Sequence, residues 1–327
     1  MDKSKTKRNV LGKINRSMNS ASGAGSLLPL LVIILLLWIT TDSFMQFDNI
    51  MQVLRQASVY ALMGIGMTFV IITGGIDLSQ GSSLALSCVC AGLTINATGN
   101  MWLGIGAALA AGAVIGLYNG VLVAYVKIPP FIVTLGSLYI VRALALWMTN
   151  STQVAISHGS FKYIGQGFLF SIPFPVYVFV IIGMIAHIML TQTAIGRHIF
   201  AIGSNAETAR LSGVHIERTT ITVYVASGIC MGIAAVVYLS RLSAAQPTAG
   251  QSYEMEAVAA TVIGGTSITG GEGGIFGTII GAIIVAIIRN GLVLLGVQSF
   301  FTQMVVGAII VAAVSLDITR KRLSANK

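Results

Sequence analysis

The chain has 327 residues, of which 55% are hydrophobic and only 9% are charged. Soluble domains carry charge on about 25% of their residues, so this composition excludes a soluble globular protein and predicts a polytopic membrane protein. The net charge of +9 does not indicate a nucleic-acid partner, because in a membrane protein the placement of charges matters more than their sum.

The first half of the chain alternates apolar runs with short polar breaks. Residues 1–25 form a basic tail. The apolar run 27–40 has no small-residue cleavage site after it, so we interpret it as an uncleaved first span. A short amphipathic re-entry is expected at 48–55. Apolar segments follow at about 58–73, 84–97, 101–126, 131–148 and 173–190, with a polar loop at 149–172.

The second half continues this alternation. Apolar helices are predicted at about 221–239, 255–263, 275–288 and 301–316, before a basic C-terminal tail at 317–327. The predicted fold is all-α: a polytopic transmembrane helix bundle of about ten membrane segments within residues 26–316. The second, third and eighth segments are short enough to be half-helices, so some segments are expected to be discontinuous.

Lys and Arg residues are unevenly distributed along this layout. With a cytoplasmic N-terminus, ten crossings place both tails, Lys127 and the stretch 191–220 on the cytoplasmic side. The N-terminal tail holds six Lys and Arg residues, the C-terminal tail four, the stretch three and position 127 one, which makes 14 of the 19. The loop 149–172 holds only Lys162. This asymmetry favours cytoplasmic termini, because positive charge gathers on that side.

The stretch 191–220 interrupts the apolar sequence with mixed charge. An ionised side chain at the bilayer centre costs at least about 2.5 to 3.5 kcal/mol, so the stretch is expected to lie in water. Its pattern is helical: Asn205 is a candidate N-cap, Glu207 falls in the first turn, Arg210 near the end, and Gly213 at the stop. Two interpretations stay open here, a solvated connector and a docking helix for a soluble partner.

Charged residues also fall within the apolar region, at Asp77, Arg142, Glu254 with Glu256, Glu272, and Arg289. Charges at such depth usually face a bundle interior or a cavity, and neighbouring glycines permit the broken helices that line transport pathways. The alternative is a helix-end residue reaching the headgroups, which weighs more for Arg142 and Arg289. The candidate pathway or broken-helix positions are Gly75, Asp77, Ser79, Asn119, Glu254, Thr266 and Glu272.

No catalytic residue and no metal site are expected. The sequence has no G-x-x-x-x-G-K-[ST], H-E-x-x-H or G-x-S-x-G motif, and its four histidines lack metal-ligand spacing. Cys88, Cys90 and Cys230 lie in apolar runs and are expected to be small core residues. These observations leave a conduit, a receptor or a scaffold.

Four long motifs occur in order: LRQASVYALMGIGMTFVIITGGIDLSQGS (54–82), IGRHIFAIGSNAETARLSGV (195–214), SAAQPTAGQSYEMEAVAATVIGGTSITGGEGG (243–274) and NGLVLLGVQSFF (290–301). Together they resemble the membrane permease subunits of bacterial ABC importers for monosaccharides, the ribose-type group. The resemblance runs from about residue 45 to the C-terminal tail. The chain departs from the family's pattern at Gln80, where a Val is expected.

The resemblance implies a bacterial inner-membrane protein that works as a pair of permease subunits. Their partners would be a two-headed cytoplasmic ATPase, which binds the ATP and Mg²⁺, and a periplasmic sugar-binding protein; this chain would bind no cofactor itself. The loop between the two groups of spans is the coupling element in this family. Its motif is matched here by Gly203, Asn205, Glu207, Ala209, Arg210, Leu211 and Gly213.

Rival interpretations remain at this stage. A stand-alone secondary sugar carrier or facilitator would need no docking helix. An ABC permease could instead serve another solute, such as a branched-chain amino acid or a furanose signal molecule. A membrane scaffold or receptor is disfavoured by broken helices that carry acidic residues within the membrane.

Overall fold

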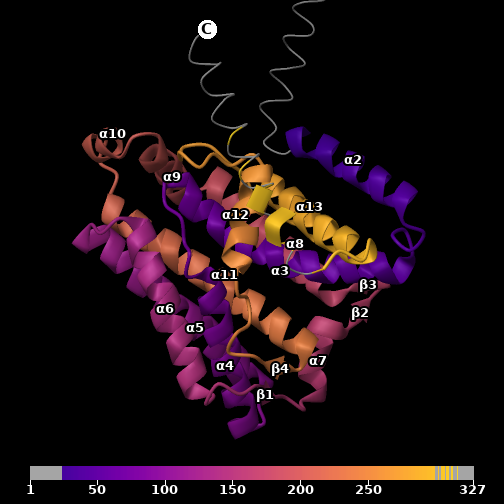
Figure 1. The fold of residues 1–327 in the computed structure, drawn as a ribbon. Helices are drawn as coiled ribbons and strands as arrows, with labels where there is room; N and C mark the ends of the chain where they lie inside the picture. The colour runs from indigo at the N-terminus through magenta and orange to yellow at the C-terminus, as the bar shows by residue number, and fades with distance from the viewer. Residues whose placement is uncertain are drawn as a thin grey trace, which may run out of the picture.

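The computed structural model describes residues 24–298 and, beyond them, positions 301, 303–305, 307, 308, 311 and 315 (Figure 1). Most of the described chain is helical. Its longer helices are α2 (Ala24–Thr40), α3 (Phe47–Ile72), α4 (Gln80–Thr98), α5 (Met101–Val121, continued by a π-turn at Leu122–Val126), α6 (Pro130–Met148), α8 (Phe174–Gln192), α11 (Ile216–Leu242) and α13 (Ile275–Leu294). The tail 317–327, residues 1–23 of the N-terminal tail and most of the expected span 301–316 lie outside the described residues.

Within this part of the chain, seven helices are long and apolar enough to cross a membrane. These are α3, α4, α5 with its π-turn, α6, α8, α11 and α13, while α2 is apolar but shorter. The chain is therefore a polytopic helical membrane protein, as the composition predicts. Two of the half-helix predictions are wrong, because α3 has 26 residues and α4 has 19. The eighth segment is short, as expected: α12 (Tyr253–Ile263) has 11 residues.

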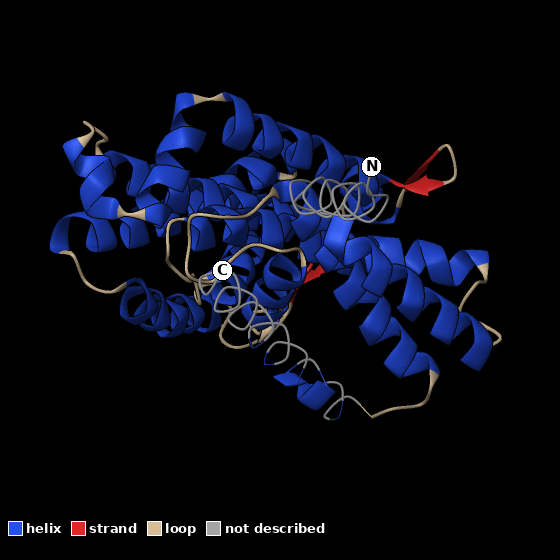
Figure 2. Cartoon of the chain, turned by 90° about the horizontal axis from the view of Figure 1, so that it is seen from above, coloured by secondary structure: helices blue, strands red, loops and turns tan. Residues whose placement is uncertain are grey.

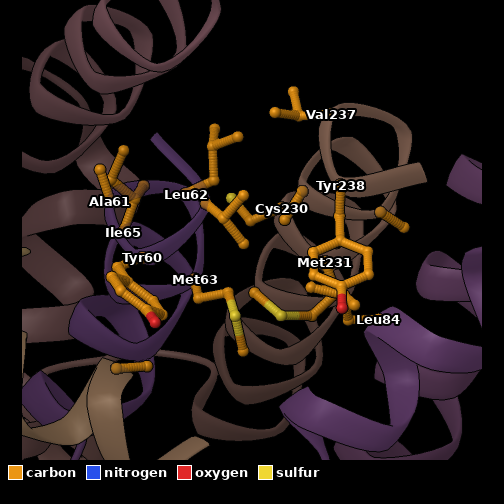
Figure 3. Close-up of a cluster of buried hydrophobic side chains, with 14 of the residues drawn as sticks. Tyr60, Ala61, Leu62, Met63, Ile65, Leu84, Cys230, Met231, Val237 and Tyr238 are labelled. Carbon is orange, nitrogen blue, oxygen red and sulfur yellow. The ribbon is translucent and has the colours of Figure 1, made fainter. Parts of the chain in front are cut away.

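Helix α3 lies at the centre of the bundle. Every residue from Ala57 to Ile72 is buried, which fits a helix that is apolar on all sides. Figure 3 shows Tyr60, Leu62 and Met63 of α3 among side chains of α11 and α4. The predicted separate re-entry at 48–55 is wrong, since these residues form the first turns of α3. Their polar groups bind elsewhere in the chain: Arg55 Nη2 donates to the Gln166 carbonyl at 2.9 Å.

Glycines allow α5 and α11 to touch backbone to backbone. A Cβ atom on Gly112 would overlap the carbonyl oxygen of Gly228, and one on Gly116 would overlap that of Tyr224. Small residues at such crossings are typical of membrane helices, where close packing replaces the hydrophobic effect as the associating force. The two helices therefore form a tight pair along much of their length.

The bundle has two distinct ends (Figure 1). At one end, here called the α10 end, lie the short helices α9 (Ala194–Ser204) and α10 (Ala206–Leu211). At the other, the strand end, lie α7 (Gly159–Gln166) and the pair of strands β1 (Val154–Ala155) and β4 (Ala244–Ala245). The expected polar loop 149–172 thus contains a helix and short strands.

The short β-strands are a minor departure from the all-α prediction (Figure 2). Besides β1 and β4, the described strands are β2 (Phe168–Leu169) and β3 (Ile172–Pro173), which pair antiparallel. Each pair is only two residues long, and β1 with β4 fastens the loop after α6 to the segment after α11.

Candidate functional site

A buried polar cluster forms where the chain leaves α3. Asp77 lies in the turn before α4 and is only 3% exposed. Its Oδ1 accepts hydrogen bonds from the Ser79 amide at 3.0 Å and the Ser79 hydroxyl at 2.6 Å. Its Oδ2 accepts from the Ser227 hydroxyl of α11 at 3.2 Å. Within the described part of the chain, Asp77 makes no ion pair, so these donors are what compensates the buried carboxyl group.

The cluster extends to α5 and α6. Asn119 Nδ2 donates to Ser79 Oγ at 2.9 Å, and the Ser137 hydroxyl donates to Asn119 Oδ1. Gln80 Nε2 donates to Ser227 Oγ at 3.1 Å. The structure therefore brings together three predicted positions, Asp77, Ser79 and Asn119. Ser137 and Ser227 were missed, and Gln80 was noticed only as a departure from the family's pattern.

The predicted position Gly75 packs beside this cluster. A Cβ atom there would lie 2.9 Å from the Tyr224 hydroxyl of α11 and 3.1 Å from a methyl group of Val70. A glycine at 75 thus lets the turn after α3 pass close to α11.

Helix α12 and the segment before it are held by charged side chains. Glu256 pairs with Arg289 of α13 at 2.6 Å, and the Arg289 guanidinium lies over the rings of Tyr60 and Tyr253 at 5.9 and 5.8 Å. Arg142 Nη1 donates to the carbonyls of residues 247 and 249 at 2.8 and 2.7 Å. The interpretation that Arg142 and Arg289 reach the headgroups is wrong, because both bind inside the chain. The predicted residue Glu254 is buried in the first turn of α12.

The Gly-rich segment 264–274 joins α12 to α13 as an irregular turn. Gly265, Gly270 and Gly271 have φ values of 90°, 83° and 76°, in the left-handed region that favours glycine. Thr266 is buried, and its amide donates to the Thr261 carbonyl at 3.1 Å. Glu272 is exposed, so this candidate does not lie in the buried polar cluster. The predicted break in the helix is confirmed.

The polar stretch forms α9 and α10, as its helical pattern predicts. Asn205 Oδ1 accepts from the Thr208 amide at 2.9 Å, which confirms the predicted N-cap, and Gly213 ends the turn with a φ of 85°. Glu207 and Arg210 are exposed, and Arg210 lies 3.5 Å from Glu217. Ala209 is buried against the bundle.

The exposed face of α10 combines charge with an apolar side chain. Leu211 is 81% exposed beside Glu207 and Arg210. Glu207 and Leu211 are four residues apart, so the two side chains lie on one face of the helix. This geometry fits both interpretations of the stretch, the solvated connector and the docking helix.

An apolar groove of about 700 Å³ runs between α4, α5 and α6. Its walls carry few polar groups, chiefly those of Thr94 and Tyr118, and none of the candidate pathway residues lines it. This groove does not have the hydrogen-bonding groups that a polar solute needs.

Comparison with known proteins agrees with this description. Residues 49–314 match the family described as branched-chain amino acid transport system / permease component. Curated relatives include the ribose import permease protein RbsC of Escherichia coli K12, 40% identical over 89% of this chain and 92% of that protein, and RbsC of Bacillus subtilis 168, 41% identical over 90% and 92%. The D-allose transport system permease protein AlsC of E. coli K12 is 38% identical over 85% and 86%.

No solved structure gives a significant match. The family match spans most of the chain, and it includes the buried cluster, the Gly-rich segment and α10. The chain therefore belongs to this family of membrane permease components, and its curated relatives confirm the resemblance to the ribose-type sugar permeases.

Proposed function

We propose that this chain is the membrane-spanning subunit of an ABC importer that moves a monosaccharide, a ribose-like pentose or a hexose, into the cell. The observation that carries the proposal is α10: a capped helix with exposed Glu207, Arg210 and Leu211 at one end of an apolar bundle. The relatives supply the solute class, since they are named as ribose and allose permeases.

The partners follow from this role. Two permease subunits, identical or related, would sit on a cytoplasmic two-headed ATPase that binds ATP and Mg²⁺, while a periplasmic sugar-binding protein delivers the solute at the strand end. This arrangement places α10 in the cytoplasm and the chain in the bacterial inner membrane, with ten crossings and cytoplasmic termini. The excess of Lys and Arg in the tails and in 191–220 supports that orientation.

The solute pathway would lie between the two copies. Within one subunit, the groove between α4, α5 and α6 is apolar, whereas the side chains of Asp77, Ser79, Asn119 and Ser227 form hydrogen bonds within one cluster. ATP binding would close the ATPase halves and displace α10, the helices would rock, and hydrolysis would reset them. Such coupling requires an element whose position both partners bias.

The test is co-purification of the ATPase with this chain. Glu207→Ala combined with Leu211→Ala removes the exposed charge and the exposed apolar side chain of α10, while Arg210 keeps its pair with Glu217. We expect a two-headed ATPase with the wild-type protein and a reduced yield with the double variant. Phe170→Ala is the matched control, because Phe170 is 88% exposed in the turn between β2 and β3, away from α10.

The outcome also separates the rivals. A folded, inserted wild-type chain that retains no ATPase, and still takes up sugar without ATP, would be a stand-alone carrier. The family's description names branched-chain amino acids, so uptake of labelled ribose, allose and leucine should be compared in the assembled importer. Uptake of leucine alone would overturn the sugar assignment and leave the ABC assignment intact.

A further inference from the structure

The end of α3 and the Gly-rich segment 264–274, far apart in the sequence, meet the end of α9 at one place. The Ile72 carbonyl, at the end of α3, accepts a hydrogen bond from the Gly271 amide at 2.9 Å. A Cβ atom on Gly203 would overlap this same carbonyl. We call this contact the Gly203 junction; it comprises Ile72, Gly203, Ser204, Gly270 and Gly271.

The junction is made mainly of backbone atoms, and the Ser204 hydroxyl is the side-chain group nearest to Gly271. Gly270 packs so closely that a Cβ there would lie 3.0 Å from the Ile72 oxygen and 3.1 Å from the Gly203 oxygen. A Cβ on Gly271 would lie 2.8 Å from Ser204 Oγ. Packed backbones have no rotamers that could absorb a displacement, so movement of one segment shifts the others.

The junction also has a particular position along the chain. Ser204 directly precedes Asn205, the N-cap of α10. Ile72 leads through the turn 73–76 to Asp77 and the buried polar cluster. Gly271 belongs to the irregular segment that links α12 to α13. One contact thus joins the exposed helix to both segments where the sequence predicts broken helices.

We propose that the Gly203 junction passes displacement of α10 to the two broken segments, and that Gly203 is the positioning residue of this transmission. The proposal rests on the function proposed above. The exposed side chains of α10, such as Glu207 and Leu211, would then bind the ATPase, whereas the Gly203 junction would couple that binding to movement of the membrane helices. A residue can be dispensable for docking and still be required for coupling.

The experiment uses the assembled importer in membrane vesicles, with sugar-loaded binding protein. Gly203→Ala is expected to lower the yield of folded protein, because its Cβ would overlap the Ile72 carbonyl, but the folded fraction should co-purify with the ATPase as the wild type does. Uptake per assembled complex, and the stimulation of ATP hydrolysis by the binding protein, should each fall roughly tenfold, a typical size for coupling between sites.

Two further glycines on the chain provide matched controls. Gly196 lies near the other end of the same helix, and the Cβ added in Gly196→Ala would overlap the Leu190 carbonyl of α8. It should lower the yield of folded protein while keeping uptake per complex. Gly106→Ala on α5 meets nothing within 4 Å and should resemble the wild type.

Wild-type uptake per complex in Gly203→Ala would overturn the proposal, and so would an equal loss of coupling in Gly196→Ala. If Gly203→Ala does not fold, Gly271→Ala decides: it should impair uptake per complex, and adding Ser204→Gly, which removes the crowded hydroxyl, should restore part of it. Loss of ATPase binding in Gly203→Ala would assign the residue to docking instead. Failure of the wild type to bind an ATPase would instead refute the proposed function.

Discussion

Replacing Asp77 tests whether its acceptor oxygens or its charge hold the turn between α3 and α4. Three donors point at the carboxyl group: the Ser79 amide, the Ser79 hydroxyl and the Ser227 hydroxyl. In Asp77→Ala all three lose their acceptor, and each buried donor left unpaired costs about 1 to 3 kcal/mol. The two hydroxyls can rotate toward other acceptors, whereas the amide cannot. We therefore expect a loss of about 3 kcal/mol.

Asp77→Asn should cost far less. Its side-chain oxygen can still accept from both groups of Ser79, and its amide can donate to the Ser227 oxygen, so about 1 kcal/mol is expected. The difference in stability between the two variants can be measured by thermal unfolding in detergent, with the folded fraction followed by size-exclusion chromatography. At about 2 to 4 °C per kcal/mol, Asp77→Ala should lower Tm by roughly 6 to 12 °C.

The same two substitutions at the exposed residue Asp42 serve as controls and should leave Tm unchanged. Equal losses in Asp77→Ala and Asp77→Asn would refute the reasoning, because they would show that the charge matters and not the acceptor oxygens. A Tm of Asp77→Ala close to that of the wild type would show that the cluster contributes little to stability.

Three further predictions follow from contacts described above. Glu256→Ala should destabilise the protein by about 3 kcal/mol, because it leaves the Arg289 guanidinium, only 21% exposed, without its partner. The double variant Glu256→Leu with Arg289→Met should recover much of the lost stability in the same Tm assay. Gly228→Ala should lower stability by about 1 to 3 kcal/mol, since its methyl group would overlap the Gly112 carbonyl, whereas Gly136→Ala, with nothing within 4 Å, should not. Asn205→Ala should destabilise α10 by about 1 kcal/mol and lower the yield of co-purified ATPase, because the helix loses its N-cap. Asn96→Ala, at the other end of the bundle, is the control. An unchanged yield of ATPase with Asn205→Ala would show that the cap is not needed for docking.

Local features of the chain were predictable because their causes are local. The N-cap at Asn205, the stop at Gly213 and the break at the Gly-rich segment each depend on residues within one or two turns. Apolar runs likewise located most of the spans to within a few residues, although they missed the start of α3 and the end of α13. These signals were enough to place α10 and the irregular segments before any tertiary contact was known.

The prediction failed where distant residues supply the compensation. The polar start of α3 was taken for a separate element, but Arg55 binds Gln166 and lies over the Phe168 ring. Arg142 binds carbonyls more than 100 residues away. Single serines such as Ser137 and Ser227 carry no pattern that links them to Asp77. Only the packing of α5, α6 and α11 brings them together.

Helix α11 runs unbroken from Ile216, beside α10, to Leu242, beside β4. Its 27 residues measure about 40 Å, which is enough to connect the two faces of a bilayer. Linkage then works in both directions. In the proposed importer, nucleotide binding changes the affinity for the sugar-binding protein by some factor. The sugar-binding protein must then change the affinity for nucleotide by the same factor. Measuring the two factors independently would show whether one shared equilibrium governs both faces.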